Sequence, residues 1–176
     1  MYQLEEETEA DWWDVEALYD LCFAPGRTAL SSYRLRDGVP KVAELCLTLR
    51  DGAEEGGALA AVIRYWPVRV GGARTLLLGP VAVHPTRQGE GLGGLLIHES
   101  LTEARRLGWG RVLLVGDAPY YSRFGFAKMP DVIMPPPTNP DRVLGLELDV
   151  GAWDGVAGEV TRDLPGEALA PSALAP

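Results

Sequence analysis

The sequence predicts one α/β (α+β) domain with a mixed, mostly antiparallel sheet that contains one parallel crossover. Three apolar runs separated by short glycine-containing turns come first, as is typical of antiparallel hairpins. An amphipathic stretch at 91–107 and an apolar run at 111–115 follow, and together with the preceding run they predict strand, crossover helix and parallel strand. An alternating segment at 143–150 predicts a further strand.

Length and composition agree with this fold class. The chain has 176 residues, of which 47% are apolar and 23% are charged, so one domain with a full hydrophobic core is expected. We assign residues 1–162 to this domain. The segment 163–176 is rich in Ala, Pro and Leu and predicts a loosely packed or disordered tail.

The net charge of −9 bears on the partners. Since a nucleic-acid-binding protein usually shows a basic patch and no basic run occurs, no nucleic-acid partner is expected. An acidic field would favour cationic substrates such as amines, but the same charge is also typical of a solvated surface. The acidic start of the chain does not resemble a signal peptide, and no apolar run is long enough to cross a bilayer. We therefore expect a cytoplasmic protein without a membrane partner. Cys22 and Cys46 fall at apolar positions and are expected to be small buried residues in a reducing compartment.

The elements before the crossover follow from periodicity and from breakers. Residues 2–5 predict an edge strand, and Thr8 with Asp11 forms the pattern of a capping box. The i, i+3, i+4, i+7 repeat that begins at Val15 predicts a helix ending near Phe23. A short helix is expected at 29–36, and the three apolar runs predict strands at 42–49, 58–70 and 75–83.

The loop after the third run has the composition of an anion-binding site. Glycines at 89, 91, 93 and 94 allow backbone N–H groups to turn inward with no Cβ in the way. A helix begins at the same point, so its free N–H groups and the positive end of its dipole face the same spot. The sequence therefore predicts a pyrophosphate cradle. Arg87 could add a charge at the rim, or it could be an ordinary solvated arginine.

Two other phosphate-binding motifs are alternatives for this loop. Gly89, Gly91 and Gly94 satisfy G-x-G-x-x-G, and Asp117 follows the next strand, as in dinucleotide-binding domains. However, residues 84–88 separate the strand from the glycines, and the chain has too few residues for a doubly wound sheet. A P-loop is excluded because no Gly-Lys-Ser/Thr follows.

The pair Gly79-Pro80 interrupts the third run and predicts a bulge or a splayed strand. Such a strand would leave backbone groups of Val81 and Val83 unpaired. An extended ligand with amide groups, such as pantetheine, could pair with them like an added strand. A bulged edge strand without a ligand is the plain alternative.

The sequence resembles the GNAT superfamily of N-acetyltransferases, in particular small bacterial members of it. The family signature Arg/Gln-x-x-Gly-x-Gly/Ala stands here as residues 88–93, after a strand end that also matches the family, Val81-Ala82-Val83-His84-Pro85. A second family element, an aromatic residue followed by Tyr-x-x-x-Gly-Phe, stands here as residues 120–126. The two motifs and the segment between them cover residues 75–126. Many family members place a full helical turn with an Asn before the tyrosine, and residues 116–119 are too short for it.

The resemblance implies a GNAT fold with splayed central strands and helices on both faces, with acetyl-CoA as co-substrate. It implies direct transfer of the acetyl group to a primary amine. By position, Tyr121 matches the tyrosine that serves as general acid to the departing thiolate, and Val83 matches the residue whose N–H polarises the thioester carbonyl. The expected cofactor-binding residues are Val81, Ala82, Val83, Gln88, Gly89, Glu90, Gly91, Leu92, Gly93 and Gly94.

The sequence says less about which residues bind the acetyl acceptor. These residues are expected at 24–40 and in the C-terminal strands, where no motif stands. Glu44, His84 and His98 are weak candidates for a base, and no metal site is indicated because clustered ligands are missing. The identity of the acceptor and the oligomeric state stay open, a homodimer included. A non-catalytic acyl-CoA-binding sensor is the alternative from another class.

Overall fold

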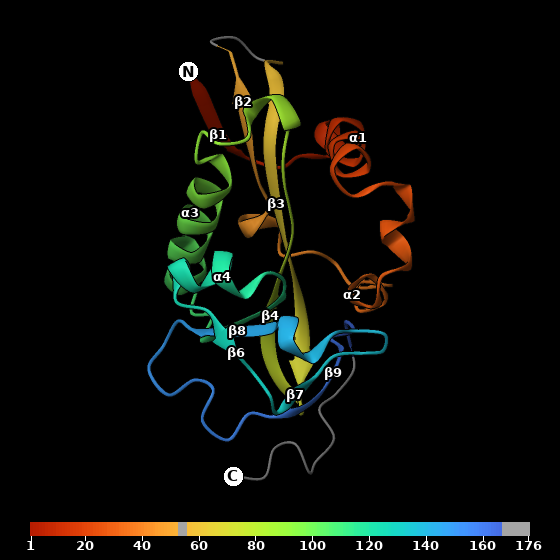
Figure 1. The fold of residues 1–176 in the computed structure, drawn as a ribbon, viewed down its shortest axis with the longest axis vertical. Coiled ribbons are helices and arrows are strands. Elements are labelled where there is room, and N and C mark those ends of the chain that lie inside the picture. The colour runs from red at the N-terminus through yellow and green to blue at the C-terminus, as the bar shows by residue number, and fades with distance from the viewer. Residues whose placement is uncertain (53–55, 167–176) are drawn as a thin grey trace.

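A mixed sheet with helices on both faces forms the domain, as the sequence predicts (Figure 1). The computed structural model describes residues 1–52 and 56–166. Strands run in the order β1-β2-β3-β4-β5-β8-β6, and β9 pairs with both β3 and β7. The pairing of β4 with β5 is parallel, and the other pairs along this order are antiparallel. The predicted crossover is therefore present in an otherwise antiparallel order.

The strands are β1 (Tyr2–Glu6), β2 (Leu47–Asp51), β3 (Ala58–Val70), β4 (Ala73–Val83), β5 (Arg111–Val115), β6 (Ala127–Lys128), β7 (Val132–Ile133), β8 (Val143–Glu147) and β9 (Gly158–Arg162). The α-helices are α1 (Trp12–Phe23), α2 (Ser31–Arg34), α3 (Leu92–Arg106) and α4 (Ala118–Tyr121). Short 3₁₀ helices occupy Glu9–Asp11, Pro25–Ala29, Ala43–Leu45, Pro85–Arg87, Ser122–Phe124 and Pro140–Arg142.

Several element boundaries differ from the sequence prediction. The strand predicted at 42–49 begins only at Leu47, because a 3₁₀ turn at Ala43–Leu45 uses the backbone groups before it. The strand predicted at 143–150 ends at Glu147, since the next two N–H groups donate to the carbonyl of Gly110. The short strands β6, β7 and β9 were not predicted from the sequence. The Thr8–Asp11 capping box is present, but it opens a 3₁₀ turn ahead of α1.

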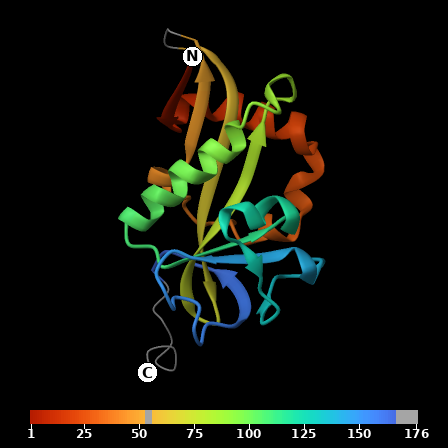
Figure 2. The ribbon, with the colours of Figure 1, turned by 60° about the vertical axis from the view of Figure 1, so that its left-hand side comes forward.

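The two faces of the central strands pack against different helices, as Figure 2 shows for α3 lying across one of them. Since side chains alternate along a strand, Ile63 of β3 faces α3 while its neighbour Val62 faces α1. The α3 side carries the larger core, with Leu96 and Ile97 fully buried. This packing fixes the N-terminus of α3 against the end of β4.

The predicted irregularity at Gly79-Pro80 lies where the central strands separate. Register between β3 and β4 shifts between Ile63 and Tyr65, opposite this pair. On the other edge, β4 pairs with β5 only at Leu76 and Leu77. The C-terminal half of β4 is therefore bonded to β3 on one edge and splayed from β5 on the other.

A buried ion-pair network ties α1 to the sheet. The Arg64 guanidinium of β3 donates to both carboxylate oxygens of Glu7, at 2.6 and 3.0 Å, and to Glu16 of α1 at 2.8 Å. Arg27, also buried, donates to Glu16 and Asp20. The network holds the segment after α1 in place beside β4.

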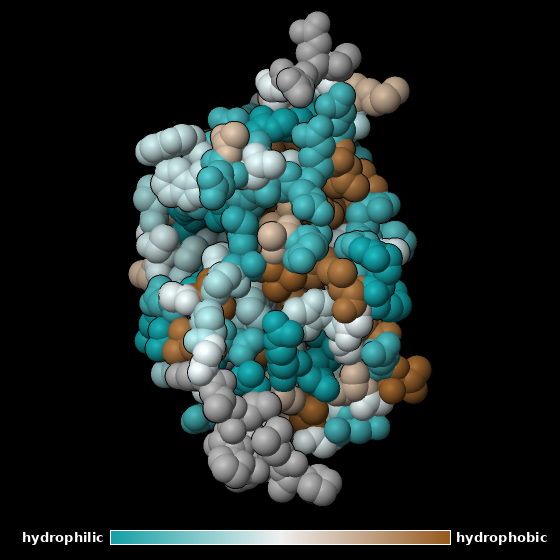
Figure 3. Space-filling model, turned by 180° about the vertical axis from the view of Figure 1, so that it is seen from behind, coloured by the Kyte–Doolittle hydropathy of each residue, from teal (hydrophilic) through white to brown (hydrophobic). Residues whose placement is uncertain are grey.

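The C-terminal end of the described chain lies against the sheet. Asp163 pairs with Arg69 at 2.9 Å and with Arg74 at 3.1 Å. The remainder of the predicted tail, 167–176, lies outside the described residues. Within residues 1–52 and 56–166, no helix is long and apolar enough to cross a membrane. Figure 3 shows one face of the molecule, where small apolar patches are interleaved with hydrophilic side chains.

Candidate active site

The glycine loop opens onto free space at the start of α3. Gly89 and Gly91 have φ values of 88° and 80°, which favour glycine, and Gly91 is the residue that caps α3. A Cβ built at either position meets no atom within 4 Å. The N-terminal N–H groups of α3 therefore face a space that an anion can enter.

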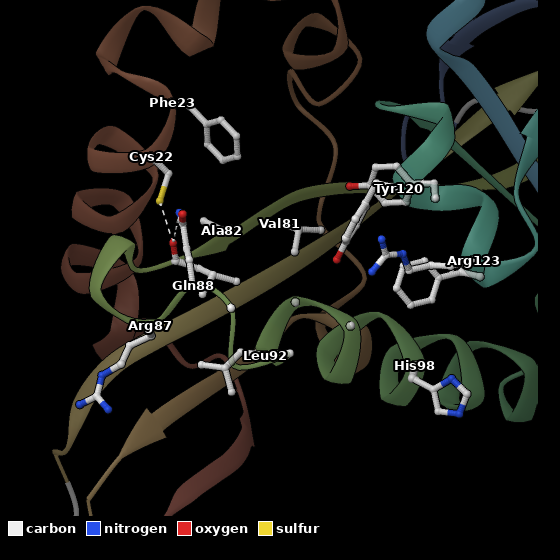
Figure 4. Close-up of a pocket in the computed structure, with 17 residues that line it drawn as sticks. Cys22, Phe23, Val81, Ala82, Arg87, Gln88, Leu92, His98, Tyr120 and Arg123 are labelled. Carbon is white, nitrogen blue, oxygen red and sulfur yellow. Dashed lines mark hydrogen bonds between the residues drawn. The ribbon is translucent and has the colours of Figure 1, made fainter.

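This space belongs to a cavity of about 760 Å³ between β4, the loop, α3 and α4 (Figure 4). Every residue predicted to bind the cofactor lines it except Glu90. The Glu90 carboxylate instead accepts a hydrogen bond from the Tyr2 hydroxyl at 2.9 Å. Only the backbone of Glu90 is therefore free for the predicted binding of the cofactor.

The splayed end of β4 presents backbone groups to this cavity. The N–H of His84 donates to the carbonyl of Ala60 in β3 at 2.8 Å. Because N–H groups alternate along a strand, those of Val81 and Val83 point away from β3, toward the gap. The Val83 carbonyl accepts from the Cys22 thiol and from the Gln88 amide, both at 3.4 Å (Figure 4). Cys22 is thus half-buried at the cavity wall rather than in the core, whereas Cys46 is buried as predicted.

Two arginines near the loop point in different directions. Arg87 lies 2.5 Å from Asp51 and extends away from the cavity centre (Figure 4), so a carboxylate already neutralises its charge. Arg123 stacks over the Tyr120 ring, 4.6 Å from its centroid, and reaches toward the start of α3. Arg123 is therefore the cation better placed for a phosphate, and no sequence motif had indicated it.

Tyr121 is one of the residues that line this cavity. Its ring packs on Gly116, where a Cβ would stand only 2.5 Å from Cε2 of the tyrosine. Burial raises the pKa of Tyr121 to about 12, so the phenol is neutral at ordinary pH. A neutral phenol that is partly screened from water is a hydrogen-bond donor to charge that develops beside it.

A second cavity, of about 310 Å³, lies on the other side of Tyr121. Phe23, Val81 and Tyr121 line both cavities. The second is walled by residues from 27–36, by Gly79-Pro80 and by Arg142. It therefore includes part of the segment in which the acceptor side was expected. Phe23, at the junction of the two cavities, had been noted from the sequence only as a helix end.

The weak candidates for a base lie elsewhere or have structural roles. Glu44 is exposed and lines a different depression beside Lys41 and Trp109. Nδ1 of His84 accepts from the N–H of Thr86, so this histidine caps the turn after β4. His98 is exposed at the cavity rim.

No full helical turn precedes the aromatic motif in the described residues 116–119, as the shortness of this segment predicts. A turn, α4, forms instead over Ala118–Tyr121 and contains Tyr120 and Tyr121. The Asp117 carboxylate caps it by accepting from the N–H of Tyr120 at 3.2 Å. The helix can begin directly after β5 because Asp117 is a good N-cap residue and Pro119 is favoured in the first turn of a helix.

A strand splayed beside a glycine-capped helix, with a tyrosine between two cavities, is the arrangement of an acyltransferase site. The model of the acetyltransferase (GNAT) family matches residues 12–126, which is more than half of the chain. The chain therefore belongs to this family of acyltransferases. The resemblance seen in residues 75–126 is confirmed.

Two relatives from Escherichia coli (strain K12) are named uncharacterized N-acetyltransferases. YhbS is 33% identical over 42% of this chain and 45% of its own length, and YjhQ is 32% identical over 51% and 57%. The chain thus spans about half the length of these relatives. Among solved structures, E. coli YhbS in complex with CoA gives a TM-score of 0.77 at 27% identity and covers 92% of this chain and 89% of that chain. A GNAT acetyltransferase from Brucella melitensis in complex with acetyl-CoA gives 0.64 at 29% identity, over 92% and 95%.

Proposed function

We propose that this chain transfers the acetyl group of acetyl-CoA to a primary amine by direct attack. The observation that carries the proposal is the meeting of two cavities at Tyr121. One cavity contains the glycine-capped helix start and a splayed strand, and the other can hold an acceptor. The CoA and acetyl-CoA complexes of the two similar structures support the assignment of the first cavity.

In this arrangement the pyrophosphate lies at the N-terminus of α3, with Arg123 beside it. The amides of pantetheine pair with the free edge of β4, and the thioester reaches Tyr121. The Val83 N–H polarises the thioester carbonyl, which gains negative charge in the transition state. We place these groups within one catalytic domain, residues 1–162, and we expect the protein to act in the cytoplasm.

The transfer forms a C–N bond and breaks the C–S bond. A neutral amine attacks the carbonyl carbon, the electron pair of the C–S bond leaves on the CoA sulfur, and the amine nitrogen loses one proton, which passes to the thiolate or to water. Tyr121 donates a hydrogen bond to the sulfur as its charge develops. An amine with a pKa near that of lysine, about 10.4, must be deprotonated before it attacks.

The test is acetyl transfer to a broad panel of amines, measured by CoA release and by the mass of the product. We expect an increase of one acetyl group on at least one amine, with an equal amount of CoA formed. Binding of acetyl-CoA without turnover of any amine would favour the sensor alternative. Failure to bind either CoA species would remove the basis of both functions.

A further inference from the structure

The second cavity is lined by basic side chains. Arg27, Arg36 and Arg142 all contribute to its wall, and Asp117 is the acidic side chain among its described lining residues. This local composition contrasts with the net charge of −9 of the whole chain. The charge around this cavity therefore differs in sign from the charge of the protein as a whole.

Two of these charged groups are already engaged within the protein. Arg27 is paired with Glu16 and Asp20, so its charge is compensated. The Asp117 carboxylate accepts the N–H that opens α4 and keeps its negative charge at the cavity wall. Arg36 and Arg142 are the two arginines of this wall without an ion pair among the described residues, so they outnumber this one carboxylate.

Arg36 is held in place without a counterion. Its guanidinium lies over the Tyr33 ring, 3.9 Å from the centroid, and 5.5 Å from that of Trp66. Its Nε is buried and has no hydrogen-bond partner, and burial lowers the pKa of the group. Among the described residues, no carboxylate forms an ion pair with it. The two aromatic rings stabilise part of this charge, and a guanidinium that is partly removed from water and has no carboxylate partner gains further from an anionic ligand.

The wall around these two arginines is preorganised. The Ser31 and Thr138 hydroxyls share a hydrogen bond of 2.6 Å, and Arg34 donates to the carbonyl of Pro136. These contacts join α2 to the loop that leads to Arg142. That arginine is exposed and forms no ion pair within the described part of the chain. A planar guanidinium stacked on an aromatic ring is well suited to bidentate binding of a carboxylate or phosphate.

We propose that the acceptor is an amine that also carries an anionic group, a carboxylate or a phosphate, and that Arg36 binds this group with Arg142 at the rim. The proposal rests on the proposed acetyl transfer and specifies its substrate class. It reverses the expectation from net charge alone, under which an acidic protein would favour purely cationic amines. The anionic group holds the amine on the far side of Tyr121 from the CoA cavity.

The test compares matched amines that differ only in the anionic group. Each amino acid is assayed beside its amide, and each phosphorylated amino alcohol beside the free alcohol. We expect kcat/KM of the wild type to favour the anionic member, and the favoured pair distinguishes carboxylate from phosphate. In Arg36→Gln we expect this preference to fall about 10- to 100-fold, mainly through KM, as for loss of a charge-assisted hydrogen bond. Arg36→Lys should keep part of the preference.

Arg106→Gln is the matched control, because it removes one arginine charge from an exposed pair with Glu103 on α3. It should leave the preference unchanged. Equal kcat/KM for both members of every pair, or an equal loss of preference in both variants, would overturn the inference while acetyl transfer itself stands.

If no amine is turned over, the anion site is tested directly on the CoA-loaded protein. Glutarate and inorganic phosphate are titrated while the chemical shift of the Arg36 Nε–H is followed by NMR. A shift of that resonance, with weaker binding in Arg36→Gln, supports the site. No binding of either anion at millimolar concentration, or equal binding by the variant, overturns it.

Discussion

Replacing Tyr121 with phenylalanine removes one hydroxyl and leaves the ring that packs on Gly116. With its pKa raised to about 12 by burial, Tyr121 is a poor acid for a CoA thiolate, since the pKa of a thiol is about 8.5. Full proton transfer would run uphill by about 3.5 units, roughly 5 kcal/mol. We therefore expect Tyr121 to act as a hydrogen-bond donor to the developing charge rather than as a full proton donor. Hydrogen bonds to charged groups contribute about 1.5–3 kcal/mol, so kcat should fall about 10- to 150-fold.

The assay is steady-state acetyl transfer together with direct titration of acetyl-CoA. We expect the dissociation constant of acetyl-CoA to stay within about twofold, because the hydroxyl matters only once charge develops on sulfur. Tyr120→Phe is the matched control, since Tyr120 lines the first cavity but not the second. It should retain kcat. An unchanged kcat in Tyr121→Phe, or an equal loss in both variants, would refute the proposed role.

Three further predictions concern the cradle, the fold and pH. Gly91→Ala and Gly108→Ala both place a Cβ at positive φ in open space, and each should lower the free energy of unfolding by about 1–3 kcal/mol. Only Gly91→Ala should also weaken CoA binding. Thermal unfolding measures the first effect and calorimetry the second, and equal affinities of the two variants for CoA would contradict the proposed cradle. Arg64→Met leaves Glu7 buried without its main partner and should cost about 3–5 kcal/mol of unfolding free energy, whereas Arg106→Met at an exposed pair should cost under about 1 kcal/mol in the same denaturant titration. Because burial raises the pKa of Tyr121 to about 12, the stability that its neutral form contributes is complete below pH 10 and is lost as the pH rises toward 12. With a good acceptor, ionisation of Tyr121 should not lower kcat below pH 10. Any fall of kcat in that range should therefore persist in Tyr121→Phe.

The features that the sequence predicted are those encoded by neighbouring residues. The glycines at 89 and 91, the helix that follows and the Gly79-Pro80 irregularity all depend on local backbone preferences. The position of Tyr121 could be anticipated because its motif follows β5 directly. The strand predicted at 42–49 was wrong in its first half. The run is mostly apolar, but Ala43 and Glu44 are exposed and lie in a 3₁₀ turn of which only Leu45 is buried, and a short apolar run alone does not distinguish such a turn from a strand.

The features that the sequence did not predict depend on residues far apart in the chain. Arg36 and Arg142 line one cavity although Arg36 follows α2 and Arg142 ends the 3₁₀ helix before β8, far apart in the chain. Arg87 lies nearest the glycine motif, yet Asp51 from another strand neutralises it, and Arg123 takes the place beside α3. Net charge could not reveal the basic side chains around the second cavity, because a total does not show where charges gather.

Calorimetric titration with acetyl-CoA, and separately with NAD, tests whether the glycine-loop cavity binds CoA. We expect one site for acetyl-CoA in the wild type, weaker binding in Arg123→Gln and Gly91→Ala, and no binding of NAD. Binding of NAD in place of acetyl-CoA, or no binding of acetyl-CoA at millimolar concentration, would contradict this assignment.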